Sequence, residues 1–82
     1  MVRIKVFQCY PVPVTFLETE EPTVREAIGE IILKFNRNTH KGRVHVEIDG
    51  KHALYDPWFC AFYKWHRTGW DRIRNTHYYF TH

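Results

Sequence analysis

The chain of 82 residues is short enough to form only one domain. Its hydrophobic share of 44% and charged share of 26% are ordinary for globular proteins, and its aromatic share of 17% is high, which together exclude a disordered chain. The formal net charge of +3 arises in residues 41–82, which hold seven Lys or Arg against four Asp or Glu, and this excess weakly favours an anionic or acidic partner.

The two cysteines, Cys9 and Cys60, are too few for a disulfide-rich secreted scaffold. We interpret both as small buried apolar residues, with a single disulfide between them as the alternative. No apolar run is long enough for a signal peptide or a membrane span. The sequence therefore predicts a reduced, cytoplasmic protein that does not enter a membrane.

The first half of the chain predicts two strands and a helix. Alternating apolar residues predict a strand over residues 2–7, and a run rich in β-branched and aromatic residues predicts a second strand over residues 14–20. Thr23 followed three residues later by Glu26 forms a capping box before an apolar pattern of helical spacing. This signature predicts a helix over residues 23–37.

A hairpin is expected after the helix. Residues 44–48 alternate between apolar and polar side chains up to Asp49-Gly50, the dipeptide that most favours a two-residue hairpin turn. The returning strand is predicted over residues 51–55, and a last strand is predicted over residues 76–81.

The segment WFCAFYKWHR, residues 58–67, has two interpretations. Asp56-Pro57 before it is typical of a helix N-terminus and Gly69 after it is typical of a helix end, so we predict a short helix. The high aromatic content favours a strand instead, and the strand is kept as the alternative.

This order of elements resembles the β-grasp, or ubiquitin-like, fold, and the resemblance covers nearly the whole chain. The segments TVREAIGEI (residues 23–31) and VHVEIDGKHAL (residues 44–54) are similar in shape to parts of ubiquitin and the small sulfur-carrier proteins. The resemblance implies an α+β domain with a mixed sheet on one main helix, a second short helix, and the last strand between the first and third. The carrier chemistry of that family requires a C-terminal Gly-Gly, whereas this chain ends in YYFTH, so what remains implied is a protein-binding module.

In the implied arrangement the sheet face opposite the helix is mostly basic with two aromatic rings, and it carries Arg3, Lys5, Phe7, His45, Glu47, His77 and Tyr79. Basic groups interleaved with rings suit single-stranded nucleic acid, because cations follow the backbone while rings stack on bases. They suit an acidic protein surface equally well. We predict a protein partner, with nucleic acid as the alternative.

The stretch from Trp58 to Trp70 holds more rings than one short helix can bury. We expect Trp58, Phe59 and Phe62 to lie in the core. We expect the remaining rings to form an interaction patch with the cations beside them, namely Tyr63, Trp65 and Trp70 with Lys64, His66 and Arg67.

Metal binding is the weaker interpretation of the hairpin histidines. Glu47 lies across from His52 in the predicted hairpin, with His45 on the same face, and such a set is able to bind a transition metal. An oppositely charged cross-strand pair explains the same residues, so we predict neither a metal nor a cofactor.

A catalytic function is the third alternative. The segment GWDRIRNTHYY, residues 69–79, is similar to the C-terminal part of RelE-type ribonuclease toxins, in which such side chains surround a phosphate. Cleavage needs an acid, a base and cations near the phosphate, and the candidates here are His66, Arg67, Arg72, Arg74 and His77. Because the first half of the chain does not follow that layout, we predict that the protein is not an enzyme.

Overall fold

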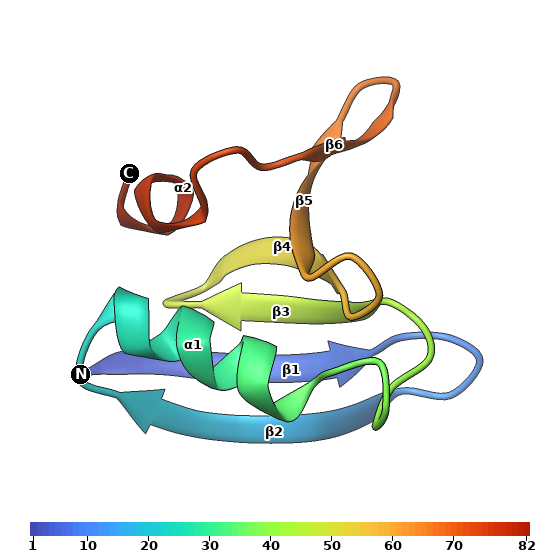
Figure 1. Ribbon diagram of the computed structural model, residues 1–82, viewed down its shortest axis with the longest axis horizontal. Helices are drawn as coiled ribbons and strands as arrows, with labels where there is room; N and C mark the ends of the chain where they lie inside the picture. The colour runs from blue at the N-terminus through green and yellow to red at the C-terminus, as the bar shows by residue number, and fades with distance from the viewer.

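The computed structural model describes all residues from Met1 to His82 and contains six strands and two helices (Figure 1). The strands are β1 (Val2–Gln8), β2 (Val14–Glu21), β3 (Val44–Ile48), β4 (Lys51–Asp56), β5 (Ala61–His66) and β6 (Gly69–Arg72). The helices are α1 (Val24–Lys34) and α2 (Thr76–Thr81). The predicted α+β class is confirmed, as are both early strands and the predicted hairpin.

The six strands form one sheet in the order β2-β1-β3-β4-β5-β6, and all neighbours are antiparallel. The prediction of a mixed sheet is therefore wrong. β1 pairs directly with β3, so no strand lies between them, where the last strand was expected. The physical reason is the length of the connections: short turns join antiparallel neighbours, and the one long connection, through α1, carries the chain from β2 across β1 to β3.

Helix α1 begins as the capping signature predicts and ends earlier than expected. The Thr23 hydroxyl accepts a hydrogen bond from the Glu26 backbone N–H at 3.2 Å. The predicted end at Arg37 is wrong, because the side chain of Asn36 donates to the Leu33 carbonyl and accepts from the Asn38 N–H. Such local hydrogen bonds compete with the helical ladder, and the helix stops at Lys34.

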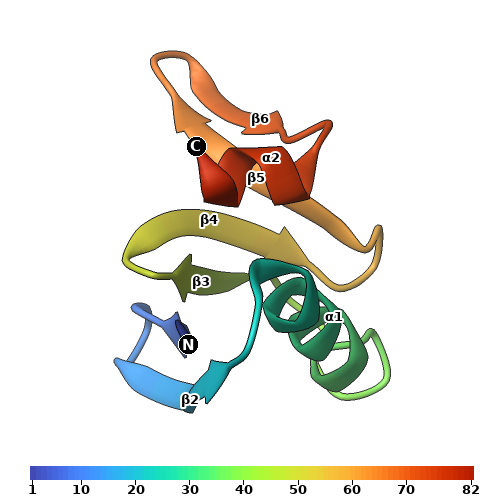
Figure 2. The same ribbon diagram turned by 90° about the vertical axis from the view of Figure 1, so that its left-hand side faces the viewer.

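The core lies between the sheet and the two helices. In Figures 1 and 2, α1 lies against one face of the strands β1 to β3, and α2 lies farther along near β5. Thirteen buried residues form a single cluster there: Ile4, Val6, Ala27, Ile31, Phe35, Val44, Val46, Ile48, Ala53, Tyr55, Phe62, Ile73 and Phe80. Every element except β2 and β6 contributes at least one residue to this cluster, and Ile73 directly follows β6. The cluster therefore links both halves of the chain.

The helix predicted over residues 58–67 is wrong, and the strand alternative describes β5. Asp56 does cap the following residues, because its carboxylate accepts from the Trp58 N–H at 2.9 Å. That bond closes a turn instead of a helix, and Cys60 follows with a φ of 50°, outside the helical region. Gly69, with a φ of 139°, forms the β5–β6 turn in place of a helix end.

The predicted last strand is also wrong, because residues 76–81 form α2. The Asn75 side chain accepts from the Tyr78 N–H at 3.0 Å and so caps the helix. The least exposed residues of α2 are Thr76, Tyr79 and Phe80, which follow helical spacing. Phe80 packs edge-on against Phe62, with ring centres 6.0 Å apart.

Both cysteines differ from expectation. Cys9 and Cys60 are exposed and free, so neither is a buried filler residue and no disulfide joins them. Neither helix is long and apolar enough to cross a membrane.

Candidate functional site

One face of the sheet carries no helix, and we call it the helix-free face. On β1, Ile4 and Val6 pack under α1, so the alternating Lys5 and Phe7 point to the opposite side. Register extends this face across the sheet, because side chains at paired positions share a face. Phe7 pairs with His45, Glu47 with His52, Leu54 with Tyr63, and Trp65 with Trp70.

A continuous line of rings crosses the helix-free face, and we call it the aromatic row. Phe7 stacks on His45 with ring centres 5.2 Å apart and planes 16° apart. His45 Nδ1 and His52 Nε2 lie 2.8 Å apart and share a hydrogen bond. His52 in turn lies 5.9 Å from Trp70, which meets Trp65 edge-on at 5.5 Å. The row therefore runs from β1 through β3, β4 and β6 to β5.

Cations cover two aromatic rings of the helix-free face, those of Phe7 and Tyr63. The Lys5 ammonium lies 5.2 Å from the centre of the Phe7 ring, and the Arg43 guanidinium lies 4.7 Å from the centre of the Tyr63 ring. Arg43 is fixed there by an ion pair with Asp56, with Nε 3.1 Å from Oδ2. Arg43 was not predicted, because its partners lie on strands that were not expected to be neighbours.

The exposure of the rings only partly follows the sequence prediction. Phe62 is buried in the core, as predicted, but Trp58 and Phe59 are 58% and 69% exposed, so their placement in the core is wrong. They lie in the turn before β5, where the backbone turns away from the sheet. Trp65 is 67% exposed, in agreement with its predicted place in a surface patch.

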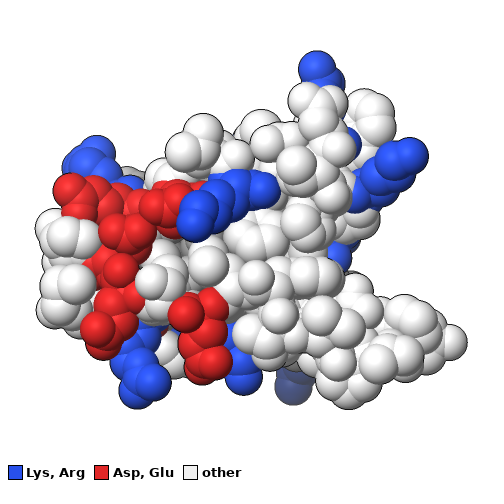
Figure 3. Space-filling model, turned by 90° about the horizontal axis from the view of Figure 1, so that it is seen from below, with Lys and Arg blue, Asp and Glu red and all other residues white.

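The prediction of a mostly basic face is wrong in the half nearest β2. Arg3 pairs with Glu20 on β2, and Lys5 has Glu18 and Glu47 as its cross-strand partners. Figure 3, which looks onto β2, shows Asp and Glu side chains gathered over this strand and the start of α1. Positive and negative groups therefore alternate there.

Apart from Arg72, which pairs with Tyr63, the other predicted binding residues lie off the helix-free face. His77 and Tyr79 belong to α2, so their placement on a sheet strand is wrong. The Tyr79 hydroxyl instead donates to the His52 carbonyl at 2.7 Å. His66 and Arg67 are exposed at the β5–β6 turn. The remaining three line a pocket beside α2: Lys64, Arg72 and Arg74.

The two hairpin histidines, His45 and His52, are hydrogen-bonded to each other. The nitrogens that face one another share one proton, so His45 and His52 satisfy each other as donor and acceptor. No three His, Cys, Asp or Glu side chains lie close enough together to hold a metal ion. The pair acts as a structural link between β3 and β4 within the aromatic row.

This pair makes stability depend on pH. Burial lowers the pKa of His52 from its ordinary value of 6.5, the neighbouring His45 lowers the pKa further, and Glu47 opposes both effects. The unfolded chain takes up a proton on His52 near pH 6.5, whereas the folded protein resists protonation. The free energy of unfolding should therefore fall as the pH decreases below about 6.5.

Urea denaturation at pH 8, 6 and 5 checks this expectation. His52→Gln should show a smaller loss of stability between pH 8 and pH 5 than the unmodified chain. His77→Gln, at an exposed helix position, is the matched control and should keep the full pH dependence. Equal pH dependence in the unmodified chain and in His52→Gln would show that His52 does not cause the loss of stability at low pH.

No family model matches the chain, and neither a curated protein nor a solved structure matches it. Its function is therefore inferred from the chemistry of its own surfaces.

Proposed function

We propose that the chain is a small, non-enzymatic binding module that holds a protein partner at the Trp65 end of the aromatic row. The observation that carries this proposal is the exposure of Trp65, which is 67% open to solvent while its ring packs against that of Trp70. Exposed tryptophans on a fixed support are frequent anchors of protein interfaces. The aromatic row behind Trp65 supplies that support.

Cations beside Trp65 define the chemistry of the partner. His66 follows Trp65 on β5 and Arg67 follows at the turn, and both are exposed. The facing strand β6 contributes the single carboxylate of Asp71, which lies 3.6 Å from His66. A partner with an apolar recess bordered by Asp or Glu complements this surface.

The occupied ring faces favour protein over nucleic acid. Bases stack on open ring faces, but His45 and Lys5 already cover Phe7, and Arg43 covers Tyr63. The carboxylates on β2 and β3 that pair with Arg3 and Lys5 would also repel phosphates. Within the aromatic row, only the Trp65 end therefore offers an open ring without a neighbouring acidic cluster.

The first test is recovery of the partner from a lysate of the source organism, with and without nuclease. We expect a protein that the unmodified chain retains after nuclease treatment and that Trp65→Ala loses. Trp58→Ala is the matched control, because Trp58 is similarly exposed but lies near Arg37, away from the aromatic row. Equal recovery by Trp65→Ala would contradict the proposed site.

A direct titration tests the nucleic-acid alternative. Labelled single-stranded RNA and DNA oligomers should show no saturable binding at micromolar protein in low salt, for the charge reasons given above. Binding that weakens steeply with added salt would indicate release of counterions from phosphates. That outcome would replace the protein partner with a nucleic acid.

The proposed relation to β-grasp proteins has limited support. The order strand, strand, helix, strand from β1 to β3 favours it. The direct pairing of β1 with β3 argues against it. The proposed function therefore depends on the aromatic row and not on this relation.

A further inference from the structure

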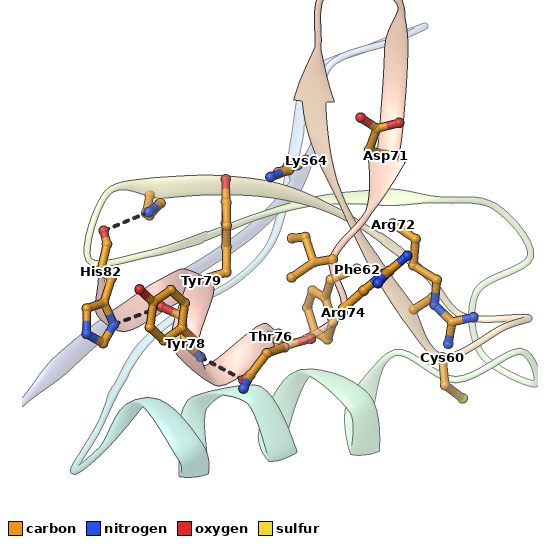
Figure 4. Close-up of a pocket in the computed structure, with 14 residues that line it drawn as sticks. Cys60, Phe62, Lys64, Asp71, Arg72, Arg74, Thr76, Tyr78, Tyr79 and His82 are labelled. Atoms are coloured by element: carbon orange, nitrogen blue, oxygen red, sulfur yellow. Dashed lines mark hydrogen bonds between the residues drawn. The ribbon is translucent and has the colours of Figure 1, made fainter.

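A second site lies beside α2, separate from the aromatic row. A pocket of about 1060 Å³ opens between the β5–β6 hairpin and α2, and we call it the C-terminal pocket (Figure 4). Lys64, Arg72 and Arg74 line it from the hairpin and the segment after β6, and Tyr78 and His82 line it from the side of α2. None of the residues of the aromatic row lines this pocket.

The C-terminal pocket has an excess of unpaired positive charge. Lys64, Arg72 and Arg74 form no ion pair within 4.0 Å. The only carboxylate in the lining belongs to Asp71, whose salt-bridge partner is His66 at the hairpin. Three cations against one carboxylate leave the lining with a net positive charge, which favours an anion from solution.

The fourth cation of the lining is held in place by the protein. Lys51 donates to the His82 carbonyl at 3.0 Å and lies 4.4 Å from the centre of the Tyr79 ring. Lys51 is therefore held against α2 by contacts within the protein. Figure 4 shows Arg72 and Arg74 close together at the opposite side of the pocket, with Lys64 apart from them.

The wall formed by α2 is aromatic. Tyr78 is 59% exposed and stacks on His82, with ring centres 4.0 Å apart and planes 14° apart. One face of the Tyr78 ring is covered by His82, and the rest of the ring borders the pocket. A volume of about 1060 Å³ far exceeds a single phosphate ion and is typical of small-molecule sites.

We infer that the C-terminal pocket binds a small organic phosphate of nucleotide size. The forked guanidinium groups of Arg72 and Arg74 match phosphate oxygens, and Lys64 adds a third positive charge. The aromatic wall at Tyr78 contacts the organic part of the ligand. This site is distinct from the proposed protein-binding site and does not depend on it.

Isothermal titration in low salt, with ADP, adenosine and inorganic pyrophosphate as separate probes, tests this assignment. We expect ADP to bind at least tenfold more tightly than adenosine, because the phosphates meet the arginines. We expect Arg72→Ala and Arg74→Ala each to weaken ADP binding about tenfold, the scale of one lost charge-assisted hydrogen bond. Thermal unfolding of each variant verifies that it is folded, and Arg72→Lys keeps the charge if the alanine variant unfolds.

The matched control is Arg67→Ala, which removes the same charge from the turn outside the pocket, and it should change ADP affinity less than twofold. An equal loss in Arg67→Ala would overturn the site, as would the absence of saturable ADP and pyrophosphate binding at millimolar ligand. Pyrophosphate binding as tight as ADP binding would overturn the assignment to a nucleotide-sized ligand. Unchanged ADP affinity in Trp65→Ala supports two separate sites.

Discussion

Replacement of Ile31 with alanine is expected to lower the free energy of unfolding by about 2–5 kcal/mol, the usual cost of a buried large-to-small change. Ile31 lies on α1 with 0% of its surface exposed, inside the cluster that joins both helices to the sheet. Its removal leaves a cavity between α1 and the buried residues of β1 and β3, including Ile4 and Val46. Urea denaturation at neutral pH measures the loss.

The matched control is Leu33→Ala on the same helix. Leu33 is 73% exposed, so deletion of a side chain of the same volume should cost less than about 0.5 kcal/mol. A loss under about 0.5 kcal/mol for Ile31→Ala as well would show that this side of α1 does not pack on the sheet.

The elements from β1 to β4 could be predicted because local signals there agree with the final fold. Alternation on β1, the Thr23 cap and the Asp49-Gly50 turn each specify one structure within a few residues. Asp49 and Gly50 have φ values of 51° and 80°, which the hairpin turn requires and which this dipeptide accepts readily. The strand order could not be predicted, because it depends on which edge β3 joins after α1.

The segment after β4 was mispredicted because its local signals fit two structures equally well. Asp56-Pro57 is able to cap a helix or a turn, and Gly69 is able to end a helix or form a hairpin turn. Rings at nearly every position between them hide the spacing that separates a strand from a helix. In residues 76–81 the helical spacing of Thr76, Tyr79 and Phe80 was present in the sequence, and a correct assignment of Asn75 as a cap would have found it.

The candidate site could be predicted in composition but not in arrangement. Trp65 was expected at the surface on a short helix and Trp70 just after that helix, whereas the two face each other on neighbouring strands. The contact between His52 and Trp70 depends on the curvature of the sheet from β4 to β6, which no local pattern encodes. The predicted cations fall into two groups because β5 and β6 present side chains on both faces of the hairpin.

Replacement of Trp65 with alanine is expected to weaken binding of the protein partner by about 2 kcal/mol or more, which is roughly thirtyfold in the dissociation constant. Stability should hardly change, because the ring of Trp65 makes an edge-to-face contact with Trp70 and is otherwise largely open to solvent. Calorimetric titration with the recovered partner gives the affinity, and thermal unfolding of the same sample gives the melting temperature.

Two further variants make this result specific. Trp70→Ala should lower both binding and the melting temperature, because Trp70 is half-buried between His52 and Trp65 and supports the aromatic row. Trp58→Ala should leave both values unchanged, because Trp58 is exposed on a different part of the surface. A large drop in melting temperature for Trp65→Ala would mean that its ring stabilises the fold of the free protein. Unchanged affinity in Trp65→Ala would show that the partner binds outside the aromatic row.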